Sequence, residues 1–342
     1  MGLDRTVALW LRSVNRRHGS TRAVVGPHIT RIRGARVELS TSIGRTRMTA
    51  QLLSARAVPL DEQEPITADW RRIVEPTRNW YYPGSDTELN LGAAQVVMHD
   101  DALQPRHFHA MDQIRFVTTG SMSYGRHQRA EAGDLVYFPE SVPYGPVQYR
   151  DGHMFVLQWP GPSVNGKFIA IHEMQAAAKE IVKGGGQFDK SKGGVFVHPD
   201  GRVQEGYEAI AEFMNGGPLT YSPRRFDNQV HVKSAAIDAA DVDGAPGVSI
   251  KHLGFFTERG PNVKLLQFAA GARLPEAMAE SQQVWDVING AITYDGKTYG
   301  SRSLLYVSPG AHRSSVHAEE DTQMLVVHLC AKGANGMPFS EF

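Results

Sequence analysis

The chain has 342 residues, enough for two domains of ordinary size, and its 36 Lys and Arg residues balance its 36 Asp and Glu residues. It is 41% hydrophobic and 21% charged, which is typical of globular proteins. No run of about 18 apolar residues occurs, which excludes an obvious transmembrane helix and gives no reason to expect a membrane partner. The single cysteine, Cys330, excludes an intrachain disulfide and fits a reducing, cytoplasmic compartment.

Residues 1–60 differ in charge from the rest of the chain. They contain eleven Arg, no Lys and two acids, Asp4 and Glu38, whereas the remaining residues include 25 basic and 34 acidic ones. Such a segment is a basic arm that binds nucleic acid or directs import, or a disordered tail. It is also typical of a misassigned start in GC-rich DNA, with Met48 as the alternative. We expect a disordered extension over 1–60, and no nucleic-acid partner.

Residues 61–167 contain short apolar runs that alternate with Gly and Pro turns, as in "AAQVVM", "QIRFVTTG", "DLVYFP" and "HMFVLQWPGP". Strands of four to seven residues at this spacing predict a β-barrel or sandwich. Residues 168–218 differ: "IAIHEMQAAAKEIVKGG" and "QEGYEAIAEFMNGG" have helical periodicity and end in glycines. Between them, "GGVFVHPDGRV" predicts a hairpin that turns at Asp200-Gly201. We therefore expect a short, partly helical connector.

The strand pattern returns over residues 219–342, in "VKLLQFAAGARLP", "QVWDVINGAITYDGKTYG" and "QMLVVHLC". A hairpin is predicted at Asp295-Gly296. Two β units of similar size around the connector predict an all-β chain with a duplicated barrel. Unpaired strand edges need cover, so we also expect a homodimer.

The stretch "PRHFHAMDQIRFVTTG" carries the chemistry of the first unit. Side chains of an extended segment alternate, so His107 and His109 share one face and form the beginning of a site for Fe, Zn, Mn, Ni or Cu. A pair of pocket histidines that bind a ligand without metal is the alternative. If Gln113 faces the barrel interior, Arg115 does too. Arg115 then binds a substrate carboxylate, phenolate or enolate, or forms an ion pair with Asp112, Asp134 or another acid near the rim.

These motifs resemble those of the cupins. The cupin motifs are His-x-His, three or four residues, Glu, six residues, Gly, and then Gly, five residues, Pro-x-Gly, two residues, His. The matching positions are His107, His109, Gly120, Gly133, Asp134 and Pro139. The departures are Asp101 before the first histidine, Gln113 for the glutamate, Ser141 for the second glycine and Tyr144 for the last histidine.

The second unit keeps the same frame without the ligands. Counting back from Gly290 places Gln283 at the glutamate position and Ala277 and Ala279 at the two histidine positions of the first motif. In the second motif, Pro309 matches the proline and Ser314 stands at the position of the final histidine. The resemblance covers most of residues 85–335. It implies two double-stranded β-helix (jelly-roll) barrels, of which only the first holds a metal.

The resemblance also implies a metal site formed by His107 and His109, with Gln113 as a weak third ligand. Tyr144 contributes only as a phenolate, or acts as an acid or base. Such a site is open, and a small substrate completes it.

We considered further residues near the two barrel interiors. His153 is a candidate ligand, although a place on the rim is the commoner role. Tyr124, Tyr137, Phe138 and Trp159 line a substrate pocket or form ordinary core. His312 and His317 in the second unit are likewise expected to have ordinary structural roles. Trp285 and Met278 are expected to fill the interior of the second barrel.

The quercetin-dioxygenase-like cupins are the branch that the sequence resembles. The leading hypothesis is a metal-dependent enzyme, an Fe(II) dioxygenase, that acts on a small enolisable or phenolic substrate oriented by Arg115. One alternative is a metal-assisted isomerase, lyase or cyclase. Another is a non-catalytic protein that binds a small molecule.

Overall fold

The computed structural model describes residues 51–52, 77–81, 91–100, 102–161, 163, 169, 171–257, 261–279, 281–307 and 312–329. The predicted extension over 1–60 lies outside this part, apart from Gln51–Leu52, and so do Met48 and Cys330. Among the described residues, no helix is long and apolar enough to cross a membrane.

The first barrel is built on one eight-stranded sheet, in which β5 and β8 form the longest pairing. Its strands are β2 (Thr77–Tyr81), β3 (Gly92–Met98), β4 (Leu103–Gln104), β5 (Met111–Gly125), β6 (Gln128–Glu131), β7 (Asp134–Phe138), β8 (Val147–Pro160) and β12 (Val230–Lys233). Alternate residues of these strands form two separate apolar clusters. One cluster, which includes Val117, Met122 and Phe138, lines the barrel interior, here called the first lumen.

Gly120 lets β5 bend over β8 to form this barrel. Its φ is +73°, and the pairing of β5 with β8 shifts register between Thr119 and Ser121. A Cβ on Gly120 would collide with the carbonyl oxygen of Asp151 and lie 2.7 Å from that of Arg150. The position therefore needs a glycine for both backbone conformation and space.

The second barrel has a seven-stranded sheet and two smaller sheets. Its strands are β1 (Gln51–Leu52), β13 (Ala240–Asp241), β14 (Val248–Phe255), β15 (Asn262–Phe268), β16 (Arg273–Leu274), β17 (Ala277–Met278), β18 (Gln282–Asn289), β19 (Ala291–Tyr294), β20 (Lys297–Gly300), β21 (Leu304–Val307), β22 (His312–Arg313), β23 (Val316–Ala318) and β24 (Thr322–Leu329). The predicted hairpin is confirmed: β19 and β20 turn at Asp295-Gly296, both with positive φ.

Trp285 lies in the core of the second barrel, as predicted. The same prediction for Met278 is wrong, because 58% of its surface is exposed. Met278 lies on the two-residue strand β17, and its side chain is not part of the core. The sequence pattern of so short a strand does not specify which face is buried.

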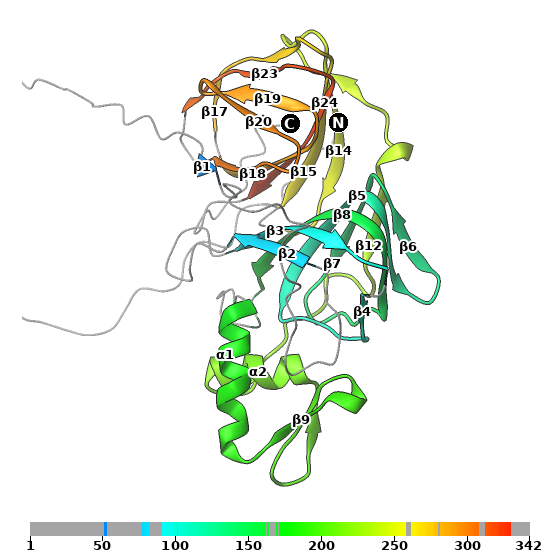
Figure 1. Cartoon of the computed structure of the whole chain (residues 1–342), viewed down its shortest axis with the longest axis vertical. Helices are drawn as coiled ribbons and strands as arrows, with labels where there is room; N and C mark the ends of the chain where they lie inside the picture. The colour runs from blue at the N-terminus through cyan, green and yellow to red at the C-terminus, as the bar shows by residue number, and fades with distance from the viewer. Residues whose placement is uncertain are drawn as a thin grey trace, which may run out of the picture. The chain divides into compact units, whose positions relative to one another are not determined.

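The connector contains α1 (Ile171–Ile181), α2 (Gly206–Asn215) and a small sheet of β9 (Gln187–Asp189), β10 (Val195–Val197) and β11 (Val203–Gln204). Short 3-10 turns lie at Val182–Gly184, Lys190–Lys192 and, after β12, Ser234–Ala236. Both predicted helices and the hairpin at Asp200-Gly201 are confirmed (Figure 1). Gly216 ends α2 in the left-handed conformation.

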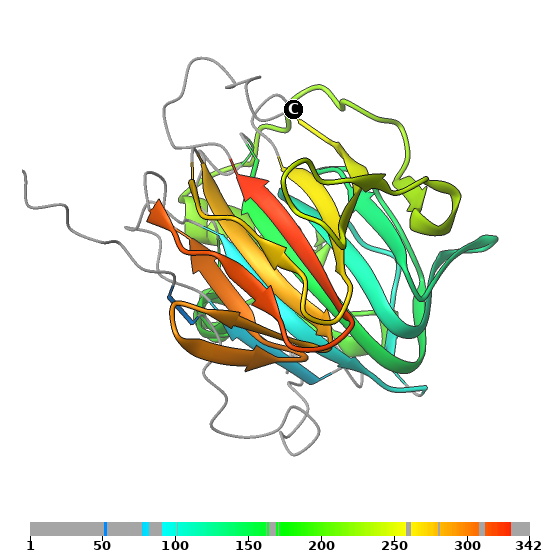
Figure 2. The same cartoon turned by 90° about the horizontal axis from the view of Figure 1, so that it is seen from above.

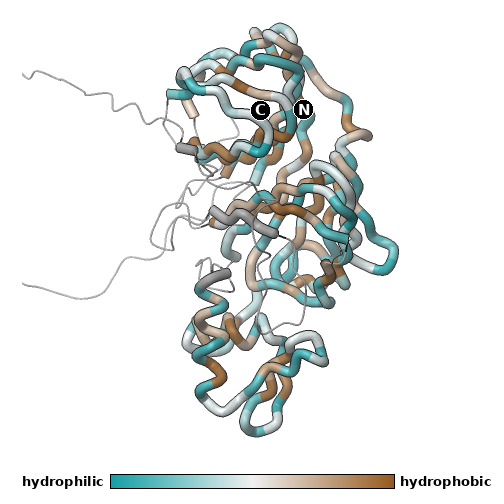
Figure 3. The backbone as a smooth tube through the Cα atoms, in the orientation of Figure 1, coloured by the Kyte–Doolittle hydropathy of each residue, from teal (hydrophilic) through white to brown (hydrophobic). Residues whose placement is uncertain are grey.

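The two barrels share one apolar core. Leu157 of β8 and Tyr137 of β7 belong to the same cluster as Val263 of β15 and Leu325 of β24. Figures 1 and 2 show these strands next to one another, cyan to green in the first barrel and yellow to red in the second. Figure 3 shows hydrophobic stretches along the strands of both barrels. Each sheet thus has one face toward its own lumen and the other toward the neighbouring barrel.

Two short strands depart from the predicted domain boundaries. β12, expected in the second barrel, pairs with β7 of the first, and His231 of β12 contacts Asp134 of β7 through Nε2 and Oδ2, 2.9 Å apart. β1, expected in the N-terminal extension, pairs with β21 of the second barrel. Strand patterns predict that a segment is extended, but not which sheet edge it joins. The all-β prediction with a partly helical connector is confirmed, whereas the homodimer concerns a second chain and stays a prediction.

Candidate functional site

The two histidines of the opening motif lie on a short extended segment between β4 and β5. A backbone bridge joins this segment to Tyr144: the His107 N–H donates to the Tyr144 carbonyl at 3.0 Å, and the Tyr144 N–H donates back at 2.9 Å. The bridge brings the side chains together, with ring centroids 4.8 Å apart for His107 and His109 and 4.5 Å apart for His107 and Tyr144. Two residues that are 37 positions apart in the sequence thus lie side by side.

The Tyr144 hydroxyl is the centre of the site. Three nitrogens surround its oxygen: Gln113 Nε2 at 2.7 Å, His109 Nε2 at 2.8 Å and Arg115 Nη2 at 2.9 Å. The amide and the guanidinium group can only donate to it. The hydroxyl proton can therefore be directed to His109 Nε2, or the oxygen can accept a proton from that nitrogen, depending on the tautomer. This geometry places one shared proton between Tyr144 and His109.

Arg115 is 4% exposed and lies inside the first lumen. Its hydrogen-bond partners are uncharged groups, namely Gln113 Oε1, Met122 Sδ, Tyr149 Oη and Tyr144 Oη. Its guanidinium carbon also lies 4.8 Å from the ring centroid of Phe138 and 5.3 Å from that of Tyr144. Among the described residues, no carboxylate lies within ion-pair distance of Arg115. The lumen therefore contains a buried positive charge.

The acids considered as partners of Arg115 face elsewhere. Asp112 accepts hydrogen bonds from Tyr137 Oη at 2.7 Å and from the Glu140 N–H at 2.9 Å. Asp134 is held by His231, as described above, so neither acid neutralises Arg115. Burial, followed by the charge of Asp112, raises the pKa of Tyr137, and burial raises that of Glu140. The predicted ion pairs of Arg115 with Asp112 and Asp134 are therefore wrong, because Asp112 faces the opposite side of β5 and Asp134 contacts His231.

Gln113 lies next to Arg115 in the lumen and is fully buried, as alternation along β5 predicted. Its Oε1 accepts from Gln158 Nε2 at 3.2 Å and from Arg115 Nε at 3.4 Å, while its Nε2 donates to Tyr144. The amide oxygen is thus occupied by two donors. Oxygen and nitrogen of an amide are assigned from such networks, and here the network is consistent throughout.

The other candidate residues fall into two groups. Tyr124 and Phe138 belong to the first lumen, whereas Tyr137 and Trp159 pack in the core shared by the barrels. His153 contacts Thr119 Oγ1 at 3.2 Å and Arg302 Nη1 at 3.3 Å, outside the lumen, which agrees with a rim position.

In the second barrel, Gln283 Oε1 accepts from Trp285 Nε1 at 2.9 Å. Ala279 of this barrel is buried. His312 lies near Glu276, and His317 lies near Glu319. Ala277 and Ala279 offer no ligand, so the candidate site is that of the first barrel.

Two aromatic residues of α2 and the segment after it, which sequence reasoning missed, contact the histidine segment. The ring of Tyr207, in the first turn of α2, lies edge-on to His109 with centroids 4.7 Å apart. Tyr221, beyond α2, lies 5.7 Å from Phe108 in the same way. A tyrosine on an amphipathic helix looks like ordinary core, so no local signal could have identified this contact.

The described residues hold no cluster of three or more His, Cys, Asp or Glu side chains that could bind a metal. His107 itself fits a metal ligand, because its Nδ1 lies 2.6 Å from the Pro105 carbonyl and its ring is thereby oriented with Nε2 as the binding atom. Two neutral imidazoles beside the Arg115 cation leave a dication poorly balanced. The donors therefore fit an open metal site that needs an anionic ligand from outside the chain.

No family model and no curated protein matches the chain. Among solved structures, a proposed dioxygenase from Nostoc punctiforme is similar with a TM-score of 0.51 and 12% identity, over 85% of this chain and 92% of that one. Protein Ylba from E. coli is similar with a TM-score of 0.47 and 8% identity, over 81% of this chain and 91% of that one. An oxalate decarboxylase from Bacillus subtilis is similar with a TM-score of 0.46 and 15% identity, over 80% of this chain and 77% of that one.

At these identities the similarity concerns the fold alone. It agrees with the architecture described above, which is an all-β chain of two joined barrels. This is the fold of a two-barrel cupin, as the sequence motifs predicted.

Proposed function

We propose that the first barrel is the active site of an enzyme that acts on a small organic anion, an enolate or phenolate. The observation that supports this best is Arg115, a buried cation whose partners are all uncharged. A buried charge without a counter-charge is costly, and a guanidinium group binds oxyanions strongly. A substrate oxyanion would therefore complete the charge balance of the lumen.

In this proposal, Tyr144 and His109 move the proton. The Tyr144 oxygen takes a proton from the substrate carbon or hydroxyl, and His109 Nε2, 2.8 Å away, accepts or returns it. The donors Arg115 and Gln113 stabilise negative charge on the Tyr144 oxygen while it acts as the base. Tyr207 covers His109 and restricts water near the reacting groups.

In the metal-dependent form of the proposal, His107 and His109 would hold a divalent cation, and a His109 nitrogen that binds the cation would not also accept the proton. Bound Fe(II) would supply oxygen activation, as in a dioxygenase, and Zn, Mn, Ni or Cu would supply Lewis-acid chemistry. Gln113 would join as the third ligand only if its side-chain amide group flipped, because its oxygen accepts hydrogen bonds from Gln158 and Arg115. Since Arg115 repels a dication, cation and substrate anion should bind cooperatively.

Metal analysis tests this form. Protein purified without oxygen is dialysed against Fe(II), with and without acetylacetone as an enolisable probe. We expect more bound iron when the probe is present, and little in His107→Ala under either condition. Equal iron in the wild type and in His107→Ala would refute the metal site.

Oxygen uptake then separates the functions, with acetylacetone and catechol as substrates. Uptake that depends on iron supports a dioxygenase. Turnover without uptake supports an isomerase, lyase or cyclase, a second candidate favoured by the position of Tyr144 between His109 and Arg115. Binding without turnover supports a non-catalytic binding protein.

A further inference from the structure

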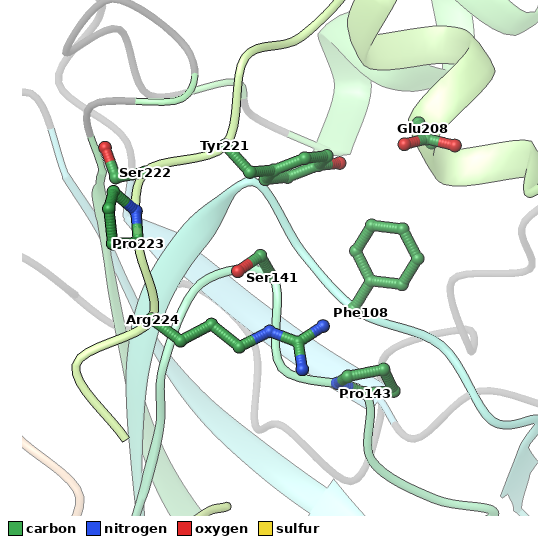
Figure 4. Close-up of a pocket in the computed structure, with 8 residues that line it drawn as sticks. All are labelled: Phe108, Ser141, Pro143, Glu208, Tyr221, Ser222, Pro223 and Arg224. Atoms are coloured by element: carbon green, nitrogen blue, oxygen red, sulfur yellow. The ribbon is translucent and has the colours of Figure 1, made fainter. Parts of the chain in front are cut away.

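A cavity of about 460 Å³ lies between the first barrel and α2 with the segment that follows it. Phe108, Ser141 and Pro143 line it from the barrel, Glu208 lines it from α2, and Tyr221, Ser222, Pro223 and Arg224 line it from the segment after α2 (Figure 4). Its volume is in the range of sites for small molecules.

This cavity is separate from the first lumen. It lies on the other side of the strand pair that carries the histidines, because neighbouring residues of an extended segment point to opposite faces. His107 and Tyr144, paired across the bridge, meet on the lumen side. Phe108 and Pro143, their neighbours in sequence, line the cavity instead. A ligand in the cavity would therefore leave the Arg115 position open.

The cavity has a cationic end and an acidic end. Arg224 extends along one side with its guanidinium group toward Phe108 and Pro143, as Figure 4 shows. No carboxylate lies within ion-pair distance of Arg224 among the described residues. In the view of Figure 4, Glu208 lies beyond Phe108, and the hydroxyl group of Tyr221 points toward the side of Glu208. Burial, followed by the charge of Glu208, raises the pKa of Tyr221, so this hydroxyl stays protonated.

Ser141 provides an independent sign of a ligand. It stands where the cupin motif has glycine, with φ at +62°, a conformation that costs a non-glycine residue about 1–2 kcal/mol. Its side chain is 7% exposed, and its hydroxyl oxygen is buried without a hydrogen-bond partner. A ligand in the cavity could bond to this hydroxyl after rotation about χ1. The residue thus has a backbone strain and an unsatisfied polar group, both at the cavity wall.

We propose that this cavity is a binding site for a small hydroxylated aromatic carboxylate. The carboxylate pairs with Arg224 and Ser141, the ring packs against Phe108 and Tyr221, and the hydroxyl donates to Glu208. The combination of one cation, two aromatic rings and one distal carboxylate matches this class. A simple carboxylate such as acetate would lack the ring and the distal donor.

Titration calorimetry with the full chain and 4-hydroxybenzoate tests the site. We expect binding to be at least tenfold tighter than that of benzoate and of neutral 4-hydroxybenzamide. Arg224→Gln should weaken binding at least tenfold. Ser141→Gly should weaken it severalfold without loss of thermal stability, because glycine tolerates the positive φ. Arg126→Gln removes the same charge at an exposed turn and should leave binding unchanged.

Arg115→Met separates this site from the first lumen. Its affinity for 4-hydroxybenzoate should equal that of the wild type. Binding that is lost in Arg115→Met and retained in Arg224→Gln would place the ligand in the lumen and overturn the proposal. Absence of binding by 4-hydroxybenzoate and its 3-hydroxy isomer at millimolar concentration would also overturn it. The first result would support the anion-binding role proposed for Arg115, whereas the second would leave that role untouched, so failure of the two proposals can be told apart.

Discussion

Replacing Asp286 by asparagine should stabilise the protein at alkaline pH. Asp286 lies on β18, in the interface between the barrels, with 3% of its surface exposed. Its Oδ1 accepts one hydrogen bond from Gln95 Nε2 of β3, at 2.7 Å. Burial raises the pKa of Asp286 from 3.8 to about 7, and the Gln95 hydrogen bond offsets only part of the rise.

The sign of the effect follows from this raised pKa. In the unfolded chain the carboxyl ionises near pH 4, whereas in the folded protein it keeps its proton until about pH 7. Stability therefore falls as the pH rises from 4 to 7, and the full cost remains above 7. Three pH units at about 1.4 kcal/mol each give an upper limit of about 4 kcal/mol. An asparagine amide left with an unpaired N–H would cost about 1–3 kcal/mol of that gain.

Denaturant unfolding at pH 5, 6, 7 and 8 measures this difference. The free energy of unfolding of Asp286→Asn minus that of the wild type should rise by about 3 kcal/mol between pH 5 and 8. Asp241→Asn, at an exposed strand position, is the control and should show no such rise. A difference that stays constant across this pH range would refute the reasoning that Asp286 is buried in its neutral form.

Three further predictions concern the first barrel. Arg115→Met should abolish binding of enolate or phenolate probes while circular dichroism and thermal unfolding stay close to wild type; unchanged affinity would contradict the anion role. Tyr144→Phe should lower turnover by about 100-fold or more with little change in KM, since general acid–base groups contribute about 10²–10⁴-fold; unaltered kcat would exclude it as the base. Gly120→Ala should destabilise by about 2–3 kcal/mol, because strain adds to the collision with Asp151. Gly296→Ala has the same φ of +73° but open space, so it should cost clearly less, and equal losses would mean that the collision is relieved.

Local physics explains why much of the fold could be predicted. Alternation along β5 placed Gln113 and Arg115 in the lumen, and Ile114 and Phe116 in the shared core. Glycines that adopt positive φ marked hairpins and helix ends, as at Gly296. These properties depend on a few neighbouring residues, so the sequence contains them directly.

The chemistry of the site depends on contacts between distant segments. Only the bridge between His107 and Tyr144 brings the Tyr144 phenol to within hydrogen-bond distance of His109 Nε2. Only the packing of β7 against β5 shows that Asp112 turns to Tyr137 and does not pair with Arg115.

The amino-acid sequence by itself determined the two barrels, the connector and the face on which the candidate residues lie. The tertiary structure decided which of them meet, which sheet β1 and β12 join, and where the connector covers the barrel. The reason is that strand periodicity sets the direction of a side chain. The charge and hydrogen bonding around that side chain come from segments tens of residues away, whose pairing no local pattern encodes.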